Sequence, residues 1–143
     1  ALFHDIARPL EEETGVPHEE AGARMAEAFL RSIHYPADCI AGVVHAIRAH
    51  RYSSGIAPET LEARVLSDAD NLDAMGAVGI ARTFLQAGER GGGIPDAAGH
   101  IRAKLLNLRG RMYTETARGI AEGRHAFLVA FLRALDDEVC PGS

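Results

Sequence analysis

Apolar residues recur along this chain at the three- and four-residue spacing of amphipathic helices, without the strict alternation of strands. The spacing predicts a helix from Pro17 to about Ile33. Its apolar positions follow one another every fourth residue, at Ala21, Met25, Phe29 and Ile33. Another helix follows Tyr35-Pro36 and ends near His50. Its apolar stripe is formed by Ile40, Val43, Val44 and Ile47.

Proline and glycine punctuate the rest of the chain. We expect a helix that ends near Ala7, its beginning absent, and then an acidic turn over residues 11–16. A long helical region is predicted from Pro58 to about Gln86, and a glycine-rich loop over residues 91–93. From Pro95 a final helical region carries the apolar series Ile101, Leu105, Leu108 and Met112. The pattern predicts an all-α protein: one helical bundle with about five to seven helices, forming a single domain over residues 1–143.

The composition, 143 residues with 47% hydrophobic and 24% charged, is that of an ordinary globular domain. The longest apolar run, 126–132, is too short to cross a bilayer, and the net charge of −5 argues against a nucleic-acid groove. The two cysteines have no zinc-site spacing, so we expect ordinary thiols in a reduced, cytoplasmic setting. Acidic residues concentrate in residues 1–38 and basic residues in 100–125. The acidic segment is suited to binding a cation and the basic segment to an anionic substrate. The alternative is that both are solvated helix faces.

Two polar clusters interrupt apolar surroundings. His4-Asp5 offers one nitrogen and one oxygen donor directly after Ala1-Leu2-Phe3. Asp68, Asp70 and Asp73 lie in an otherwise apolar helical stretch, where an uncompensated carboxylate is costly. Asp68 and Asp70 lie about 200° apart around a helix, and both directions carry apolar neighbours, so periodicity does not choose between them. These carboxylates either hold a cation or form a polar face paired with Arg64 or Arg82.

Helical geometry does separate the two histidines of the helix that ends near His50. His45 lies away from the apolar stripe and is predicted to be at the surface. His50 lies at the edge of the stripe and at the helix end, where it either faces a cleft or caps the helix. Lys104 flanks the apolar series of the final region, so its ammonium either enters a site or extends into solvent.

These residues resemble the HD-domain metal-dependent phosphohydrolases, an all-α superfamily named for its His-Asp pair. Phe3-His4-Asp5 matches the pair, and Ala69-Asp70-Asn71-Leu72 matches the segment with the distant aspartate ligand. The resemblance therefore selects Asp70 over Asp68. It is nearest to small bacterial hydrolases of the YedJ and YpgQ kind. It extends over most of the chain, through the segments 46–53, 60–77, 104–106 and 114–125.

The resemblance implies a divalent ion held by His4, Asp5 and Asp70 and a substrate that is a nucleotide or another small phosphate ester or anhydride. The ion would be Mn, Fe, Co, Ni, Zn or Mg, and it would activate a water molecule. His18 and His50 match positions for a second metal or for substrate. Arg51 and Lys104 are expected phosphate contacts. The sequence departs from the family pattern in two places, because the first metal-ligating histidine would lie upstream of Ala1 and Asn71 replaces a usual basic residue. Both departures suit the alternative, a non-catalytic nucleotide-binding or regulatory module.

Overall fold

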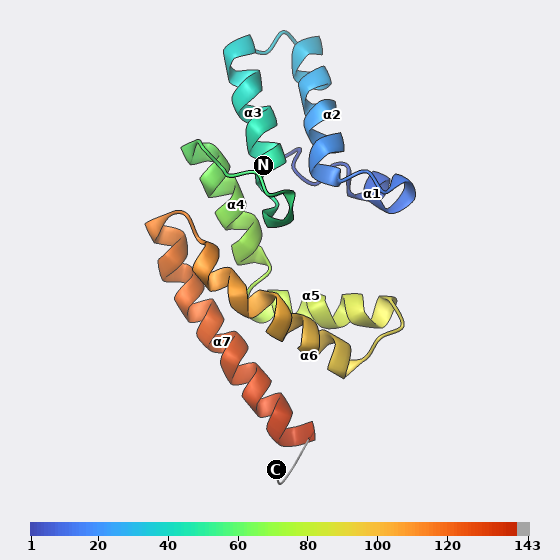
Figure 1. Ribbon diagram of the computed structural model, residues 1–143, viewed down its shortest axis with the longest axis vertical. Helices are drawn as coiled ribbons and strands as arrows, with labels where there is room; N and C mark the ends of the chain where they lie inside the picture. The colour runs from blue at the N-terminus through green and yellow to red at the C-terminus, as the bar shows by residue number, and fades with distance from the viewer. Residues whose placement is uncertain (140–143) are drawn as a thin grey trace. The chain divides into compact units, whose positions relative to one another are not determined.

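The computed structural model describes residues 1–139, apart from the side chain of Tyr52, so the expectation for Cys140 lies outside the described residues. Those residues form seven α-helices and two short 3₁₀ segments, with no strand, which confirms the all-α class (Figure 1). None of the helices in this part of the chain is both long and apolar enough to span a bilayer. The chain divides into two compact units, residues 1–70 and the residues from 71 onward. The single domain over residues 1–143 stays a prediction.

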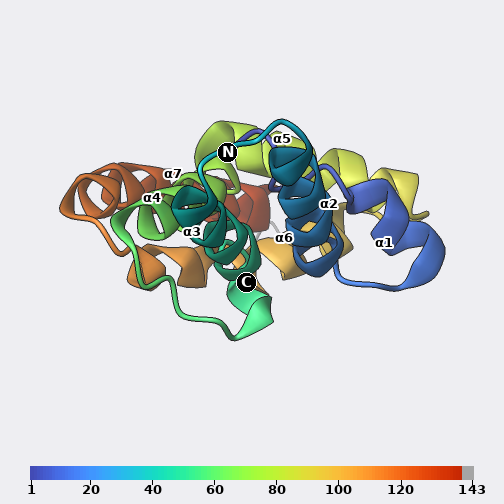
Figure 2. The ribbon, with the colours of Figure 1, turned by 90° about the horizontal axis from the view of Figure 1, so that it is seen from above.

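The first unit is organised around two helices that lie side by side, α2 (His18–Ser32) and α3 (Ala37–Ala49), as two views of the ribbon show (Figure 1 and Figure 2). It also contains α1 (Arg8–Thr14), the 3₁₀ turn Tyr52–Ser54 and most of α4 (Leu61–Asp73). One cluster of its buried apolar residues is formed by Ala23, Ala26, Leu30, Ile40, Val44 and Ile47, with Phe3 and Val43 packed against them. The stripe predicted for α3 is therefore the face that packs.

The stripe predicted for α2 is wrong. Met25, Phe29 and Ile33 are 41%, 48% and 52% exposed. The buried face instead begins at His18 and continues through small residues, Gly22, Ala23 and Ala26, to Leu30. Small side chains let the backbone of another segment approach closely: a Cβ atom on Gly22 would lie 3.3 Å from the carbonyl oxygen of Phe3. The approach of α2 to the His4-Asp5 segment thus outweighs burial of the larger side chains.

The predicted N-terminal helix ending near Ala7, with an incomplete beginning, is also not what the structure contains. Residues 2–7 form successive turns, with main-chain bonds such as His4 N–H to the Ala1 carbonyl. The helix follows instead, as α1, over residues expected to form an acidic turn. Pro9 fits because it stands in the first turn, where no N–H is needed, and Glu11 is favourable near a helix N-terminus. Gly15 ends α1 in the left-handed conformation, at φ 72°.

The long helical region predicted from Pro58 to Gln86 consists of two helices, α4 and α5 (Gly76–Glu89). The break falls at Ala74-Met75, and Gly76 has φ 74°, a value that side chains disfavour. A Cβ atom on Gly79 would lie 2.1 Å from the Ala74 carbonyl oxygen, so the chain can turn this sharply only over a glycine.

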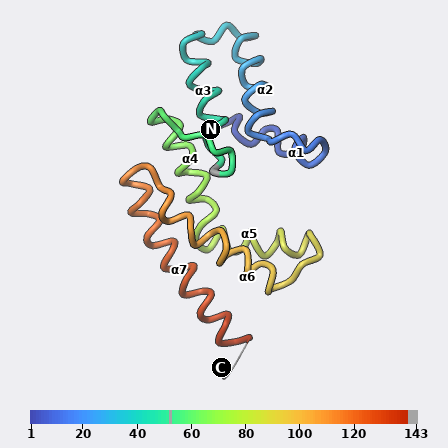
Figure 3. Tube along the Cα trace, in the orientation of Figure 1, coloured from blue at the N-terminus to red at the C-terminus, as the bar shows by residue number. Residues whose placement is uncertain are grey.

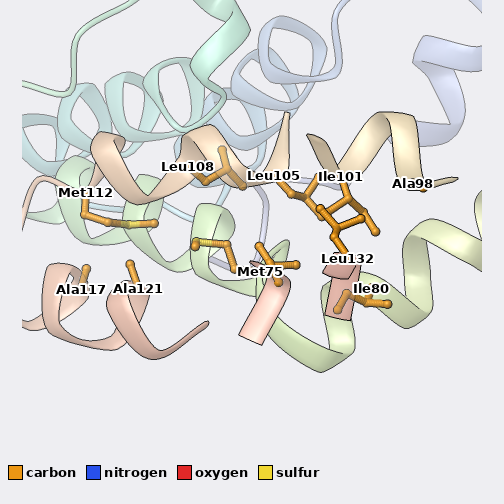
Figure 4. Close-up of a cluster of buried hydrophobic side chains, with 11 residues drawn as sticks. Met75, Ile80, Ala98, Ile101, Leu105, Leu108, Met112, Ala117, Ala121 and Leu132 are labelled. Atoms are coloured by element: carbon orange, nitrogen blue, oxygen red, sulfur yellow. The ribbon is translucent and has the colours of Figure 1, made fainter. Parts of the chain in front are cut away.

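The second unit packs α5 against α6 (Ile94–Ala103), the 3₁₀ segment Leu105–Arg111 and α7 (Glu115–Val139), whose paths the trace shows (Figure 3). Gly91 to Gly93 connect α5 to α6, as predicted. The predicted apolar series Ile101, Leu105, Leu108 and Met112 is buried throughout, although the α-helix gives way to 3₁₀ geometry within it. These side chains meet Met75, Ile80 and residues of α7, among them Ala121 and Leu132 (Figure 4).

Candidate metal centre

Four separate segments of the first unit bring histidine and aspartate side chains together. His4 and Asp5 come from the N-terminal turns, His18 from the first residue of α2, His50 from the end of α3, and Asp70 from α4. His18 and His50 are 2% and 1% exposed, whereas the other three are half-buried. The sequence named all five as candidates.

Each of the three imidazoles is anchored through Nδ1 to an oxygen atom. His4 Nδ1 lies 2.5 Å from the Ala1 carbonyl, and His50 Nδ1 lies 2.6 Å from the Ile47 carbonyl. His18 Nδ1 lies 2.6 Å from Oε2 of Glu11. A carbonyl or carboxylate oxygen only accepts hydrogen bonds, so Nδ1 is the donor in all three rings. The lone pair of each neutral imidazole is therefore on Nε2.

Those Nε2 atoms face one another and the carboxylate of Asp5. His18 Nε2 lies 3.4 Å from His50 Nε2 and 3.3 Å from Oδ1 of Asp5. The distance from His50 Nε2 to the same oxygen is 3.8 Å. Within the described residues, Asp5 Oδ1 is buried and accepts no hydrogen bond. Lone pairs that converge in this way repel one another unless a cation or proton lies between them, which is the electrostatic requirement of a metal site.

The electrostatics keep these groups in the form that binds cations. Burial works to raise the pKa of Asp5, but the hydrogen bond and charge of Arg8 hold the pKa below its usual value. The Arg8 Nε atom lies 2.8 Å from Asp5 Oδ2, which leaves Oδ1 to the histidines. Burial lowers the pKa of His50, against the opposing effects of the Ile47 carbonyl and of Asp70. At neutral pH this favours a carboxylate beside an unprotonated imidazole.

Two groups of donor atoms in this cluster have the compactness of a metal site. His4, Asp5 and Asp70 form one, and Asp5, His18 and His50 form the other, with the atoms of each group within 4.8 Å of one another. The groups share Asp5. A mixed set of imidazole and carboxylate donors fits the transition metals and, through its oxygens, Mg²⁺. The converging donors and the orphaned Asp5 oxygen show that the residues present fit a divalent ion.

An outer layer of charged residues surrounds His18. Arg51 lies 2.7 Å from Glu11 Oε1 and 3.4 Å from Glu19 Oε2. Glu11, Glu19 and His18 form a third compact group of donors, but the guanidinium of Arg51 already contacts both of its carboxylates. Sequence reasoning missed Glu11 and Glu19. The position of Glu19 directly after His18 could have indicated a role beside that histidine. The contact of Glu11 with His18 depends on the folding of α1 beside α2.

Other candidates lie outside this cluster. Asp68 is buried, and none of the donor groups within residues 1–139 includes it. His45 is half-buried and accepts a hydrogen bond from the Glu59 N–H at 3.0 Å, so the surface position predicted for it is only approximate. Asp73 pairs with Arg82 at the surface, as the polar-face alternative expected. Lys104 is exposed at the end of α6 in the second unit, and its contact with phosphate stays a prediction.

Comparison with known proteins gives a family for this arrangement. The HD domain family matches residues 1–75, which include all five residues of the cluster. The uncharacterized protein YpgQ of Bacillus subtilis is 46% identical over 89 residues, or 59% of this chain and 43% of YpgQ. The chain thus aligns with less than half the length of this curated relative.

Solved structures agree with the fold. The crystal structure of B. subtilis YpgQ in complex with ADP matches with a TM-score of 0.71 and 36% identity, over 84% of this chain and 62% of that one. A predicted HD superfamily hydrolase from an uncultured Thermotogales bacterium matches with a TM-score of 0.67 and 37% identity, over 96% of this chain and 63% of that one. Both structural matches extend beyond residues 1–75, which the HD domain family matches.

Proposed function

The chain belongs to the HD-domain family, and from this membership and the cluster we propose that it is a metal-dependent phosphohydrolase acting on a nucleotide or another small phosphate ester or anhydride. The observation that carries the proposal is the buried, unbonded Oδ1 of Asp5, turned toward the Nε2 atoms of His18 and His50. A nucleotide is the favoured substrate class because the related YpgQ has been crystallised in complex with ADP.

In this proposal His4, Asp5 and Asp70 hold a divalent ion of the Mn, Fe, Co, Ni, Zn or Mg series. When bound, such an ion stabilises negative charge on phosphoryl oxygens and makes water nucleophilic near neutral pH. His18 and His50 share Asp5 with that group, so they serve either a second ion or the phosphate of the substrate.

The chain's own residues prepare the site for this chemistry. The Nδ1 anchors of His4 and His50 fix each ring, so no rotation is needed when a cation or substrate arrives. The lowered pKa of His50 keeps its Nε2 free to accept a proton or a hydrogen bond at neutral pH. Burial of His18 and His50 excludes water from the inner side of the cluster, which strengthens electrostatic interactions there.

Arg51 is a weaker candidate for phosphate than the sequence suggested. Its guanidinium already lies between the carboxylates of Glu11 and Glu19, and a phosphate would compete with both. We therefore assign phosphate binding to the ion and, when an Nε2 atom carries a proton, to His18 or His50.

The metal assignment is tested by substituting Asp70 and its neighbour Asp68. After loading with Mn²⁺ and removal of free metal, elemental analysis should find that Asp70→Asn binds manganese at least about tenfold more weakly than the parent. Asp68→Asn should retain the parent's manganese content, with circular dichroism confirming that both variants fold. Equal stoichiometry in the parent and Asp70→Asn would refute the ligand set, and loss in Asp68→Asn alone would place the motif two residues out of register.

The reaction is tested by measuring phosphate release from nucleoside mono-, di- and triphosphates with the manganese-loaded protein. Turnover that disappears in Asp70→Asn supports the hydrolase. Nucleotide binding without any turnover would replace it with the alternative, a non-catalytic regulatory module.

A further inference from the structure

Glu11 anchors the Nδ1 atom of His18 with a side-chain carboxylate, whereas the Nδ1 atoms of His4 and His50 are anchored by main-chain carbonyls. Its Oε2 lies 2.6 Å from Nδ1 of His18. The contact spans seven residues, from α1 to the first residue of α2, so it exists only because residues 8–14 are helical.

The carboxylate of Glu11 is itself held in place. While Oε2 accepts from His18, Oε1 accepts from Arg51 at 2.7 Å. The hydrogen bond to Arg51, and then that to His18, lowers the pKa of Glu11, so the group is ionised at neutral pH. An ionised carboxylate with one partner on each oxygen cannot rotate without breaking a charge-assisted hydrogen bond.

The neighbouring carboxylates do not provide the same contact. Glu19 is buried, but its Oε2 lies 3.5 Å from His18 Nδ1, at the limit of hydrogen bonding, and only 3.4 Å from Arg51. Glu12 and Glu13 follow Glu11 on α1 and are exposed. They are therefore natural controls for the charge and helix propensity of Glu11.

We propose that Glu11 is a positioning residue that fixes His18 as the Nδ1–H tautomer and so directs its Nε2 lone pair toward Asp5 and His50. Without Glu11, the proton is free to move to Nε2, where it occupies the lone pair that a cation needs. The benefit to metal or substrate rests on the proposed function, whereas the tautomer is a property of the protein alone.

The tautomer is measured directly in the metal-free protein by two-bond ¹H–¹⁵N correlation of the histidine rings. At pH 8.5, about two units above the ordinary histidine pKa of about 6.5, we expect the Nδ1–H pattern for His18 in the parent. Glu11→Ala should shift His18 toward the Nε2–H pattern. Glu12→Ala should leave the parent pattern unchanged.

An Nε2–H tautomer in the parent, or a parent-like pattern in Glu11→Ala, overturns the proposal. If Glu11→Ala does not fold, the parent spectrum still decides it, because an Nε2–H pattern for His18 in the parent contradicts the stated geometry.

In the manganese-loaded enzyme, Glu11→Ala should reduce kcat/KM by about 10- to 100-fold, whereas Glu12→Ala should leave kcat/KM unchanged. A change of tautomer in a protein that hydrolyses no phosphate would leave the role of Glu11 standing and remove the proposed function.

Discussion

Replacing Arg51 with methionine separates a structural cation from a phosphate-binding one. Arg51 contacts Glu11 at 2.7 Å and the buried Glu19 at 3.4 Å. A charge pair at 3.4 Å and an effective dielectric constant of about 20 interacts by about 5 kcal/mol before desolvation is subtracted. Removing one partner of a fully buried pair costs about 3–5 kcal/mol. The Arg51 side chain is 37% exposed. Solvent screening therefore reduces the expected loss in free energy of unfolding to about 2–3 kcal/mol.

Urea denaturation of the metal-free proteins at pH 7, followed by circular dichroism, measures this loss. The matched control is Arg48→Met, because Arg48 also joins α3 to α2, through Glu20, with both side chains 39% exposed. It should cost no more than about 1 kcal/mol. Adding Glu19→Gln to Arg51→Met should recover part of the loss, because the buried carboxylate left without a cation is then gone.

The difference between the parent and Arg51→Met should depend on pH with a definite sign. The pKa of Glu11 is lowered in the folded protein from an ordinary value of 4.5, first by its hydrogen bond to Arg51. Its contribution is therefore fully present above about pH 4.5 and is lost as the pH falls through the folded-state pKa. A loss below about 0.5 kcal/mol at pH 7, together with a raised KM for nucleotide, would show that the guanidinium serves substrate instead.

Two further predictions concern the ends of helices. His34 has φ 57° after α2, the left-handed conformation that Gly15 adopts after α1. His34→Gly should therefore raise the free energy of unfolding by about 0.5–1 kcal/mol, and Gly15→Ala should lower it by a similar amount. Urea denaturation measures both changes. Burial, then the charges of Lys104 and Arg90, lowers the pKa of His100, so its NMR titration should fall below 6.5 and Lys104→Met should raise it. Because the unfolded chain then binds the proton more tightly, this residue should reduce stability as the pH falls below about 6.5.

The fold was predictable where one periodic face does the packing. The stripe of α3 and the series from Ile101 to Met112 are buried as their spacing indicates. The stripe of α2 misled because its larger apolar residues lie beside a run of small ones, and close approach to the His4-Asp5 segment favours the small side. The break before Gly76 was missed because periodicity continues through it, while the strain at that glycine is a property of the backbone.

Residues of the candidate site were predictable where a short stretch of sequence was enough to identify them. His4 and Asp5 are adjacent, and His50 lies at the edge of an apolar stripe. All three were therefore identified as candidates from local sequence. Helical angles could not choose between Asp68 and Asp70 because the helix has apolar neighbours on both sides. The layer of Glu11, Glu19 and Arg51 depends on contacts between α1, α2 and the end of α3, which no local pattern specifies.

The anchoring of the three imidazoles has a consequence for how this site can evolve. His4 and His50 each donate to the carbonyl three residues earlier, so any sequence that keeps those turns keeps the tautomers, whatever side chains stand there. The orientation of His18 depends on the side chain at position 11, which a single codon change removes. One donor of the cluster is therefore open to mutational adjustment while the other two are inherited with the backbone. Variation at position 11 offers a route to retune cation or substrate affinity without rebuilding the fold.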